Sequence, residues 1–194
     1  MSELSHLNIG TLKSKFDLQD FVETGCYLGN GIQCATDNNF TNIHSCDINQ
    51  IYVTDCKTKF THANIIHSES LAFLKELLPT LNNRTLFWLD AHFPDYYGTN
   101  DKTEEFRIPL ITEMELIKQL KPDYSKDVFI CDDMRTFRSP LNSRYIEGEI
   151  EERFYIDVDW NYFTGIFTNT HEYELINALD GVMVFHPKDY KDQK

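Results

Sequence analysis

Short apolar runs alternate with segments of helical periodicity along most of the chain, a pattern typical of βαβ units. Several of the runs are continuously hydrophobic, as expected for strands that are covered on both faces. Five strands are predicted in this way: Asp20–Gly25, Asn42–Asp47, Ala63–His67, Thr85–Asp90 and Asp127–Asp133. The pattern therefore predicts an α/β protein built on a mostly parallel sheet.

The segments between these runs predict helices, for example through the 3/4 spacing of leucines in "SLAFLKELLPTL", which ends near Pro79. The helices are expected at Asn30–Asp37, Gln50–Phe60, Ser70–Leu81 and Pro109–Leu120. Beyond the fifth strand we expect a loop with a short helix over 138–154, then two β-like runs, "FYIDVDWNYF" and "GVMVFHP". The fold class is a Rossmann-like open sheet of about seven strands, with an antiparallel C-terminal strand, helices on both faces and ligands at the carboxyl ends of the strands.

Composition narrows the class of protein. The 194 residues are 41% apolar and 25% charged, as in an ordinary soluble globular protein, and we expect one domain over 1–194. No stretch approaches the roughly 18 apolar residues of a membrane span, and the start of the chain lacks a signal layout. A cytoplasmic location is expected, which for a viral protein is the host cytoplasm. The odd number of cysteines, without any CxxC pair, predicts five free thiols.

The net charge of -13 restricts the partners. Nucleic acid and anionic membrane surfaces are disfavoured, because binding to phosphate requires clustered Lys and Arg. A neutral or cationic substrate fits better, as does a metal ion held by carboxylates.

The stretch "ETGCYLG", from Glu23 to Gly29, follows the first predicted strand, and an aspartate, Asp47, ends the second. Glycines at this place allow a sharp turn and close approach to a ligand. The spacing matches neither the phosphate loop nor GxGxxG. Taken singly, Glu23 could be a solvated acid and Asp47 a helix N-cap, but their joint placement at successive strand ends favours a ligand site.

This layout resembles motif I of the class I S-adenosylmethionine-dependent methyltransferases. The resemblance implies that S-adenosylmethionine is the cofactor and that Asp47 binds both hydroxyls of its ribose. The other residues that it places on the cofactor are Glu23, Thr24, Gly25, Tyr27 and Gly29 in the loop, and Ser68, Glu69 and Ser70 near the adenine.

Three aspartates end the fourth and fifth predicted strands: Asp90, Asp132 and Asp133. Neighbouring ends of a parallel sheet face one cleft, and three anions there would raise one another's pKa unless a cation neutralises them. Oxygen ligands of this kind suit Mg²⁺, Mn²⁺ or Ca²⁺. Zinc fits them less well, but it becomes a candidate if His92 is also a ligand.

The motifs "LDAHF", "IPLITEMELI" and "FICDDMRTF" are similar to those of small macrocin-type and glycan O-methyltransferases of bacteria and large DNA viruses. The resemblance covers about three fifths of the chain, from Phe21 to Phe137. It implies methylation of a sugar or glycan hydroxyl, assisted by Mg²⁺ or Mn²⁺ on the three aspartates. Members of the family have another acid at the position of His92. This difference weakens the expectation that the enzyme requires a metal ion. Related enzymes often form homodimers, but no surface stripe in this sequence identifies such an interface.

A sugar hydroxyl is a poor nucleophile, so a base or a metal must take or share its proton. Either of the catalytic candidates, Asp90 or His92, could take the proton; we favour His92 as the base, with Asp90 on the metal. The alternative for His92 is a partly buried histidine bonded to a backbone carbonyl. Tyr96 and Tyr97, in the polar loop Phe93–Pro109, and Arg135 are the candidate substrate contacts. For the loop, the alternative is a plain solvated segment.

Two other functions compete with methyl transfer. A metal-dependent hydrolase would use Asp90, His92, Asp132 and Asp133 but leave "ETGCYLG" without a role. A non-catalytic nucleotide-binding module would bind the cofactor without needing Asp90.

Overall fold

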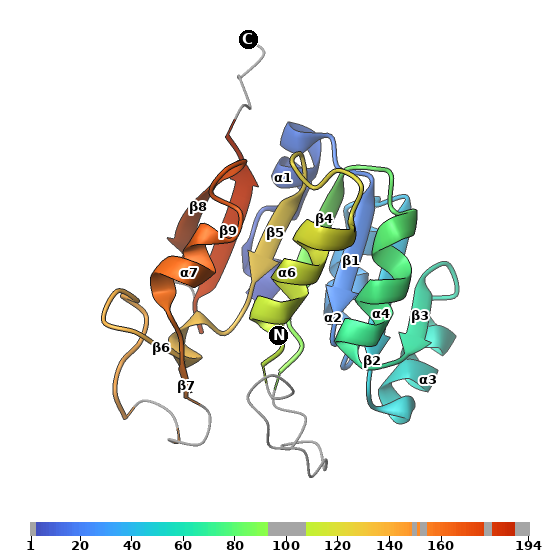
Figure 1. The fold of residues 1–194 in the computed structure, drawn as a ribbon. Helices are drawn as coiled ribbons and strands as arrows, with labels where there is room; N and C mark the ends of the chain where they lie inside the picture. Colours follow the sequence, from blue (N-terminus) through green and yellow to red (C-terminus); the bar gives the residue numbers. More distant parts are fainter. Residues whose placement is uncertain (1–2, 93–107, 149–150, 152–154, 177–179, 189–194) are drawn as a thin grey trace.

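The computed structural model describes residues 3–92, 108–148, 151, 155–176 and 180–188. Its centre is a seven-stranded sheet with the order β3-β2-β1-β4-β5-β9-β8 (Figure 1). The strands are β1 (Asp20–Thr24), β2 (Asn42–Asp47), β3 (Asn64–His67), β4 (Thr85–Leu89), β5 (Val128–Cys131), β8 (His171–Ile176) and β9 (Val182–Pro187). Strands β1 to β5 pair in parallel, and β9 runs antiparallel to both of its neighbours. The predicted fold class is thus confirmed.

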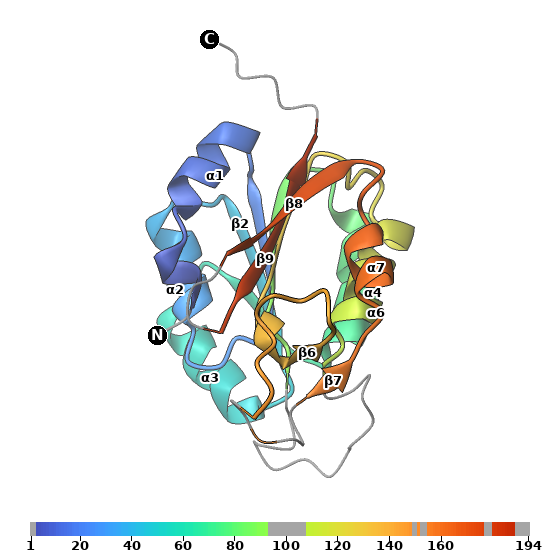
Figure 2. The same cartoon turned by 90° about the vertical axis from the view of Figure 1, so that its left-hand side faces the viewer.

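Helices cover both faces of this sheet, as Figure 2 shows edge-on. One face carries α1 (Ile9–Phe16), α2 (Asn30–Asp37) and α3 (Gln50–Lys59), and the other carries α4 (Ser70–Leu77), α6 (Leu110–Leu120) and α7 (Trp160–Gly165). Short elements complete the described chain: the 3-10 helices η1 (Glu3–His6), η2 (Leu78–Thr80) and η4 (Met134–Thr136), and a parallel pair of β6 (Phe137–Arg138) with β7 (Ile156–Asp157). None of the described helices combines the length and the apolar character needed to cross a bilayer.

The continuous apolar runs are explained by this two-sided cover. All five residues of β4 are buried; Leu86 and Trp88 belong to the core beneath α1 to α3, whereas Phe87 and Leu89 belong to the core beneath α4, α6 and α7. Alternate side chains of a strand point to opposite faces, so a strand covered on both sides needs apolar residues at every position.

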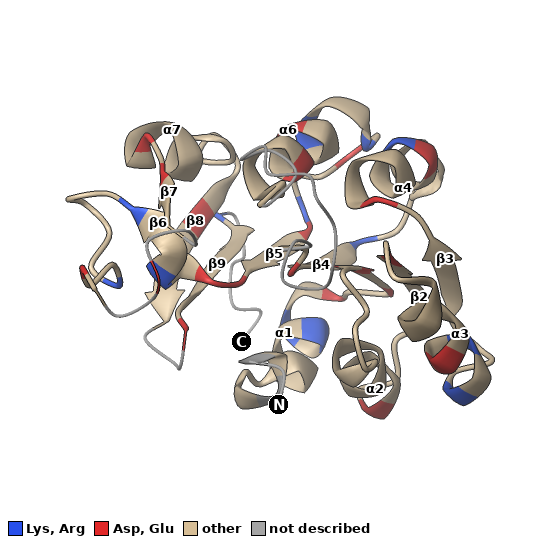
Figure 3. Ribbon diagram, turned by 90° about the horizontal axis from the view of Figure 1, so that it is seen from below, with Lys and Arg blue, Asp and Glu red and all other residues tan. Residues whose placement is uncertain are grey.

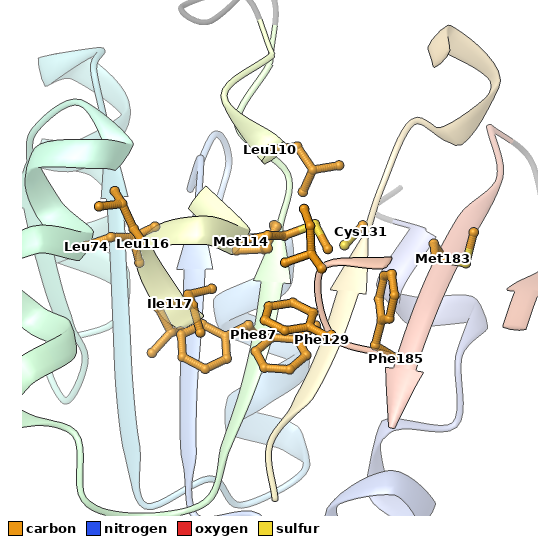
Figure 4. Packing of buried hydrophobic residues seen from close by; sticks show 14 of the residues in the cluster. Leu74, Phe87, Leu110, Met114, Leu116, Ile117, Phe129, Cys131, Met183 and Phe185 are labelled. Carbon is orange, nitrogen blue, oxygen red and sulfur yellow. The ribbon is translucent and has the colours of Figure 1, made fainter. Parts of the chain in front are cut away.

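Helix α6 packs its apolar side chains on the second of these cores. Met114 and Ile117 are fully buried against Phe87 and Phe129 of the sheet (Figure 4). The same helix also buries an acid, Glu113, close to the carboxyl ends of the strands.

The second predicted β-like run is confirmed as β9, but the first, over 154–163, is wrong. Within the described part of this run, 155–163, only Ile156–Asp157 is a strand, and a helix begins at Trp160. The Asp159 side chain caps that helix by accepting the backbone N–H groups of Asn161 and Tyr162. The aromatic residues of this run have the composition of a strand, but the Asp159 cap begins a helix among them.

Three further differences concern weakly patterned segments. Helix α1 was not predicted, although Asn8 caps it by accepting the N–H of Thr11 at 3.1 Å. Strand β8 was not predicted either, because three of its six side chains are exposed at the edge of the sheet and no apolar run marks it. The short helix expected over 138–154 does not occur in the described residues 139–148, which form turns.

Candidate active site

A cavity of about 310 Å³ lies at the carboxyl ends of the parallel strands. Figure 3 looks onto this edge of the sheet, where acidic segments lie at the ends of the central strands. Among the described residues, seven acids and no Lys or Arg line the cavity: Glu23, Asp47, Glu69, Asp90, Asp132, Asp133 and Asp180. Such a wall favours a neutral or positively charged ligand.

Glycines let the loop after β1 approach the cavity closely. Gly29 caps α2 with a φ of +85°, in the left-handed region that favours glycine. Two residues further, a Cβ on Gly31 would lie 1.8 Å from Oε1 of Glu23. The start of α2 therefore passes directly over the Glu23 carboxyl, which only a glycine permits.

Glu23 is a buried member of the cavity wall, with 2% of its surface exposed. Ser45 Oγ donates to its Oε2 at 2.6 Å. Burial raises the pKa of Glu23 well above its usual value, Ser45 opposes that rise, and the charges of Asp90 and Asp47 add to it. The alternative of a solvated strand-end acid is thereby excluded.

Asp47 presents a carboxylate that the backbone holds in place. Its Oδ2 accepts the N–H of Tyr27 at 2.9 Å and its Oδ1 accepts the N–H of Asn49 at 2.8 Å. The N-cap of α3 is Asn49, whose own side chain accepts the N–H of Ile51, so Asp47 is not the cap. Each carboxylate oxygen can accept a second hydrogen bond, which leaves Asp47 able to bind two vicinal hydroxyls.

The segment after β3 forms another part of the wall. Ser68, Glu69 and Ser70 all line the cavity, with Glu69 exposed at the N-cap of α4 and Ser70 buried. Tyr27 and Tyr52 also line the cavity, and their rings meet edge to face with centroids 4.9 Å apart. Aromatic rings and two serine hydroxyls on the wall of one cavity suit the binding of a heteroaromatic base.

Two of the residues assigned to the cofactor lie outside the described cavity wall, namely Thr24 and Gly29. Thr24 is buried, and its hydroxyl accepts the N–H of Asp90 at 3.3 Å while lying 3.4 Å from Oε2 of Glu113. The Thr24 side chain therefore faces the protein interior rather than the cavity.

The segments after β4 and β5 bring three polar side chains together. His92 Nδ1 lies 2.9 Å from Oδ2 of Asp133 and 3.2 Å from Oδ1 of Asp90, and 2.8 Å from the Asp90 carbonyl oxygen. Trp88 Nε1 donates to the second oxygen of Asp90 at 3.1 Å. These contacts orient the imidazole through Nδ1, as in a histidine that is held by carboxylates.

The three side chains of this cluster shift one another's pKa values. Burial lowers the pKa of His92, but Asp133 and Asp90 outweigh burial and raise it well above the usual value. For Asp133, burial raises the pKa and His92 more than offsets this, so that the carboxylate is favoured. Burial raises the pKa of Asp90, and the contact with His92 opposes the rise.

The cluster differs by one member from the metal set expected from sequence. Donor atoms of Asp90, His92 and Asp133 lie within 4.8 Å of one another. Asp132 also lines the cavity; its Oδ1 accepts the backbone N–H of Asp133 at 2.8 Å, and its side chain lies close enough to Asp90 to oppose the rise in the pKa of Asp90. Two carboxylates and an imidazole fit a divalent ion such as Mn²⁺ or Zn²⁺ better than Mg²⁺, which prefers oxygen alone.

The candidate substrate residues are only partly placed. Arg135 forms an ion pair with Asp180, so its charge is engaged by the wall of the cavity itself. Tyr96 and Tyr97, with most of the predicted loop Phe93–Pro109, lie outside the described residues.

Some wall residues were not singled out from sequence. Trp88 could have been found, because it precedes Asp90 by two positions and so shares its face of the strand. For Asp180, no pattern in the neighbouring sequence indicates that it belongs to a site. It reaches the cavity because its backbone carbonyl and that of Gly181 accept the N–H groups of Arg135 and Met134.

No protein-family model and no curated protein sequence matches the chain. Solved structures do match it in fold. A structure described as a caffeoyl-CoA O-methyltransferase of Staphylococcus aureus aligns over 96% of this chain and 83% of its own, with a TM-score of 0.61 and 15% identity.

Two structures that contain S-adenosylhomocysteine (SAH) also align. The methyltransferase PaMTH1 of Podospora anserina covers 93% of this chain and 76% of its own at 13% identity, with a TM-score of 0.53. An O-methyltransferase of Bacillus cereus covers 92% of this chain and 78% of its own at 10% identity, with a TM-score of 0.52. The chain therefore has the fold of the class I methyltransferases.

Proposed function

We propose that this protein transfers a methyl group from S-adenosylmethionine to a hydroxyl of a sugar or glycan. The observation that carries the proposal is one cavity with two functional ends. Asp47, held by the N–H groups of Tyr27 and Asn49, lies on the wall that also contains Asp90, His92 and Asp133.

The first end suits the cofactor. Asp47 would accept both ribose hydroxyls, because each of its oxygens has a further lone pair. Tyr27, Ser68 and Ser70 would border the adenine. The acidic wall would favour the positively charged sulfonium, and that sulfonium supplies the electrophilic methyl group.

The second end suits the acceptor. His92 is oriented through Nδ1 by Asp90 and Asp133. These acids raise the pKa of His92 and favour its protonated form, so the imidazole would take the acceptor proton only in its neutral form. The lack of Lys and Arg among the described wall residues disfavours phosphorylated acceptors and agrees with a neutral sugar.

A divalent ion would be held by Asp90, His92 and Asp133. When bound, it would act as a Lewis acid and lower the pKa of the acceptor hydroxyl. Ligation through Nδ1 would require an Nδ1 that carries no proton, whereas the two carboxylates beside it favour a proton there. His92 therefore serves either as base or as ligand, and metal removal distinguishes the two.

Calorimetric titration with SAH, with and without Mn²⁺, is the first test. We expect micromolar binding by the wild type and loss of binding in Asp47→Ala. Acceptor sugars are then screened for a mass gain of one methyl group. Absence of SAH binding under both conditions would contradict the proposal, and a hydrolase acting through the same cluster would then be favoured.

A further inference from the structure

Helix α6 carries one charged side chain in an otherwise apolar interior. Glu113 is fully buried, next to Met114 and one turn from Ile117, which are both core residues. Burying a carboxyl group costs free energy that a leucine at the same place would not. The acid must therefore do something there that an apolar side chain cannot do.

Its contacts show what that is. Thr24 Oγ1, at the end of β1, donates to Oε2 of Glu113 at 3.4 Å. The Ser70 hydroxyl, at the start of α4, also lies close enough to favour the ionised Glu113. Oε1 makes no well-aligned hydrogen bond among the described residues, so this carboxyl retains capacity for a donor.

The direction of the hydrogen bonds links Glu113 to the active site. A threonine hydroxyl has one hydrogen to donate. Because Thr24 Oγ1 accepts the N–H of Asp90 at 3.3 Å, its hydrogen is left for Glu113. The bonds thus run from the backbone of Asp90 through Thr24 to Glu113.

We propose that Glu113 is a positioning residue of the cofactor cavity, which holds Thr24 and Ser70 together and, through Thr24, sets the place of Asp90. The inference deepens the proposed function and rests on it. Ser70 belongs to the cavity wall, whereas Glu113 does not, so its effect on a ligand is indirect.

The charged and titratable groups around Glu113 come from four elements. Asp90 beyond β4 and Glu69 at the start of α4 face it, as do the thiols of Cys46 in β2 and Cys131 in β5. Burial raises the pKa of Glu113 to about 7, and the Ser70 and Thr24 hydroxyls oppose that rise. Glu113 is therefore partly ionised at neutral pH, and both its ionised and its protonated form keep an oxygen that can accept a hydroxyl hydrogen.

The test is the affinity of the full-length protein for SAH, measured by calorimetry alongside thermal melting. Glu113→Leu removes the acceptor of two hydroxyls, and we expect the Kd to rise by about tenfold or more. Glu113→Gln keeps an oxygen acceptor, so we expect the Kd to recover to within about threefold of wild type. Leu116→Ala, a buried truncation on the same helix, is the matched control and should lower the melting temperature without changing the Kd.

A double-mutant cycle covers the case in which Glu113→Leu does not fold. Thr24→Val should weaken SAH binding in the wild type and have a smaller effect when combined with Glu113→Ala, which removes the acceptor, because the two residues act through one hydrogen bond. Additive effects in this cycle, or a Glu113→Leu variant that binds SAH like the wild type, would overturn the inference. Failure of the wild type to bind SAH would instead overturn the proposed function.

Discussion

His92 Nδ1 lies 2.9 Å from Oδ2 of Asp133, and this contact joins the segment after β4 to the segment after β5. The two residues are 41 positions apart in sequence, yet both line the cavity. The contact fixes which nitrogen of His92 faces the acids, and the proposed chemistry depends on that orientation.

The first prediction concerns this histidine. His92→Asn should lower kcat for the acceptor by about 10²- to 10⁴-fold, the usual contribution of general acid–base catalysis. SAH binding should stay within about twofold of wild type, because the contacts assigned to the cofactor lie at the other end of the cavity. Single-turnover kinetics and calorimetry measure the two effects. Equal losses in kcat and in SAH affinity would show that His92 supports the cavity as a whole.

The second prediction concerns Asp47. Asp47→Ala removes the acceptor of two backbone N–H groups and, in the proposal, of two ribose hydroxyls, so SAH affinity should fall by at least about tenfold. Asp55→Ala is the matched control, since Asp55 is an exposed acid on α3 and its loss changes the net charge equally. Retention of wild-type affinity in Asp47→Ala would refute the ribose assignment.

The third prediction tests the close approach of α2 to β1. Gly31→Ala would place a Cβ 1.8 Å from Oε1 of Glu23, and we expect a loss of about 1–3 kcal/mol in the free energy of unfolding, as for overpacking. Gly165→Ala is the control, because no described atom beyond its chain neighbours and its own helix backbone lies within 4 Å of the added Cβ. Urea denaturation compares the two variants, and equal stabilities would mean that Glu23 moves aside at no cost.

The fourth prediction concerns a buried ion pair at the opposite edge of the sheet. Lys121 Nζ lies 3.1 Å from Oδ2 of Asp127, and both side chains are almost fully buried. Lys121→Met should cost about 3–5 kcal/mol of stability, because it leaves an uncompensated buried carboxylate. Lys57→Met, at an exposed position of α3, should change stability by no more than about 0.5 kcal/mol. If the two variants unfold at the same urea concentration, the pair contributes nothing to stability.

The fifth prediction concerns acid sensitivity. Burial lowers the pKa of His171 from 6.5 to about 4, and its Nε2 donates to the Asp127 carbonyl at 3.0 Å. A group with a lowered pKa in the folded state contributes stability above its unfolded pKa and loses it as the pH falls. The free energy of unfolding should therefore decrease between pH 6.5 and 4, by at most about 3 kcal/mol from this residue.

His171→Gln is the variant that isolates this contribution, since glutamine does not titrate. Its unfolding free energy, measured by denaturation at several pH values, should vary less than that of the wild type over the same interval. Parallel curves for the two proteins would assign the acid sensitivity to other groups.

Sequence patterns were sufficient for the central strands. The runs in β4 and β5 are apolar because both faces of the sheet are covered, so the cause of the pattern and the fold coincide. The bounds of α2 and β2 agree with the prediction, since glycines and Asp47 mark their ends. The edge strand β8 and helix α1 were not found, because their side chains are largely exposed or marked only by a cap.

By itself, the sequence determined the order of strands and helices and the acids that end the strands, since both follow from local periodicity and from adjacency along the chain. Which atoms meet was decided only by the tertiary structure. It brought His92 against both Asp90 and Asp133, and it turned Thr24 away from the cavity and toward Glu113. These choices depend on side-chain directions and on contacts between segments far apart in sequence, which no local pattern encodes.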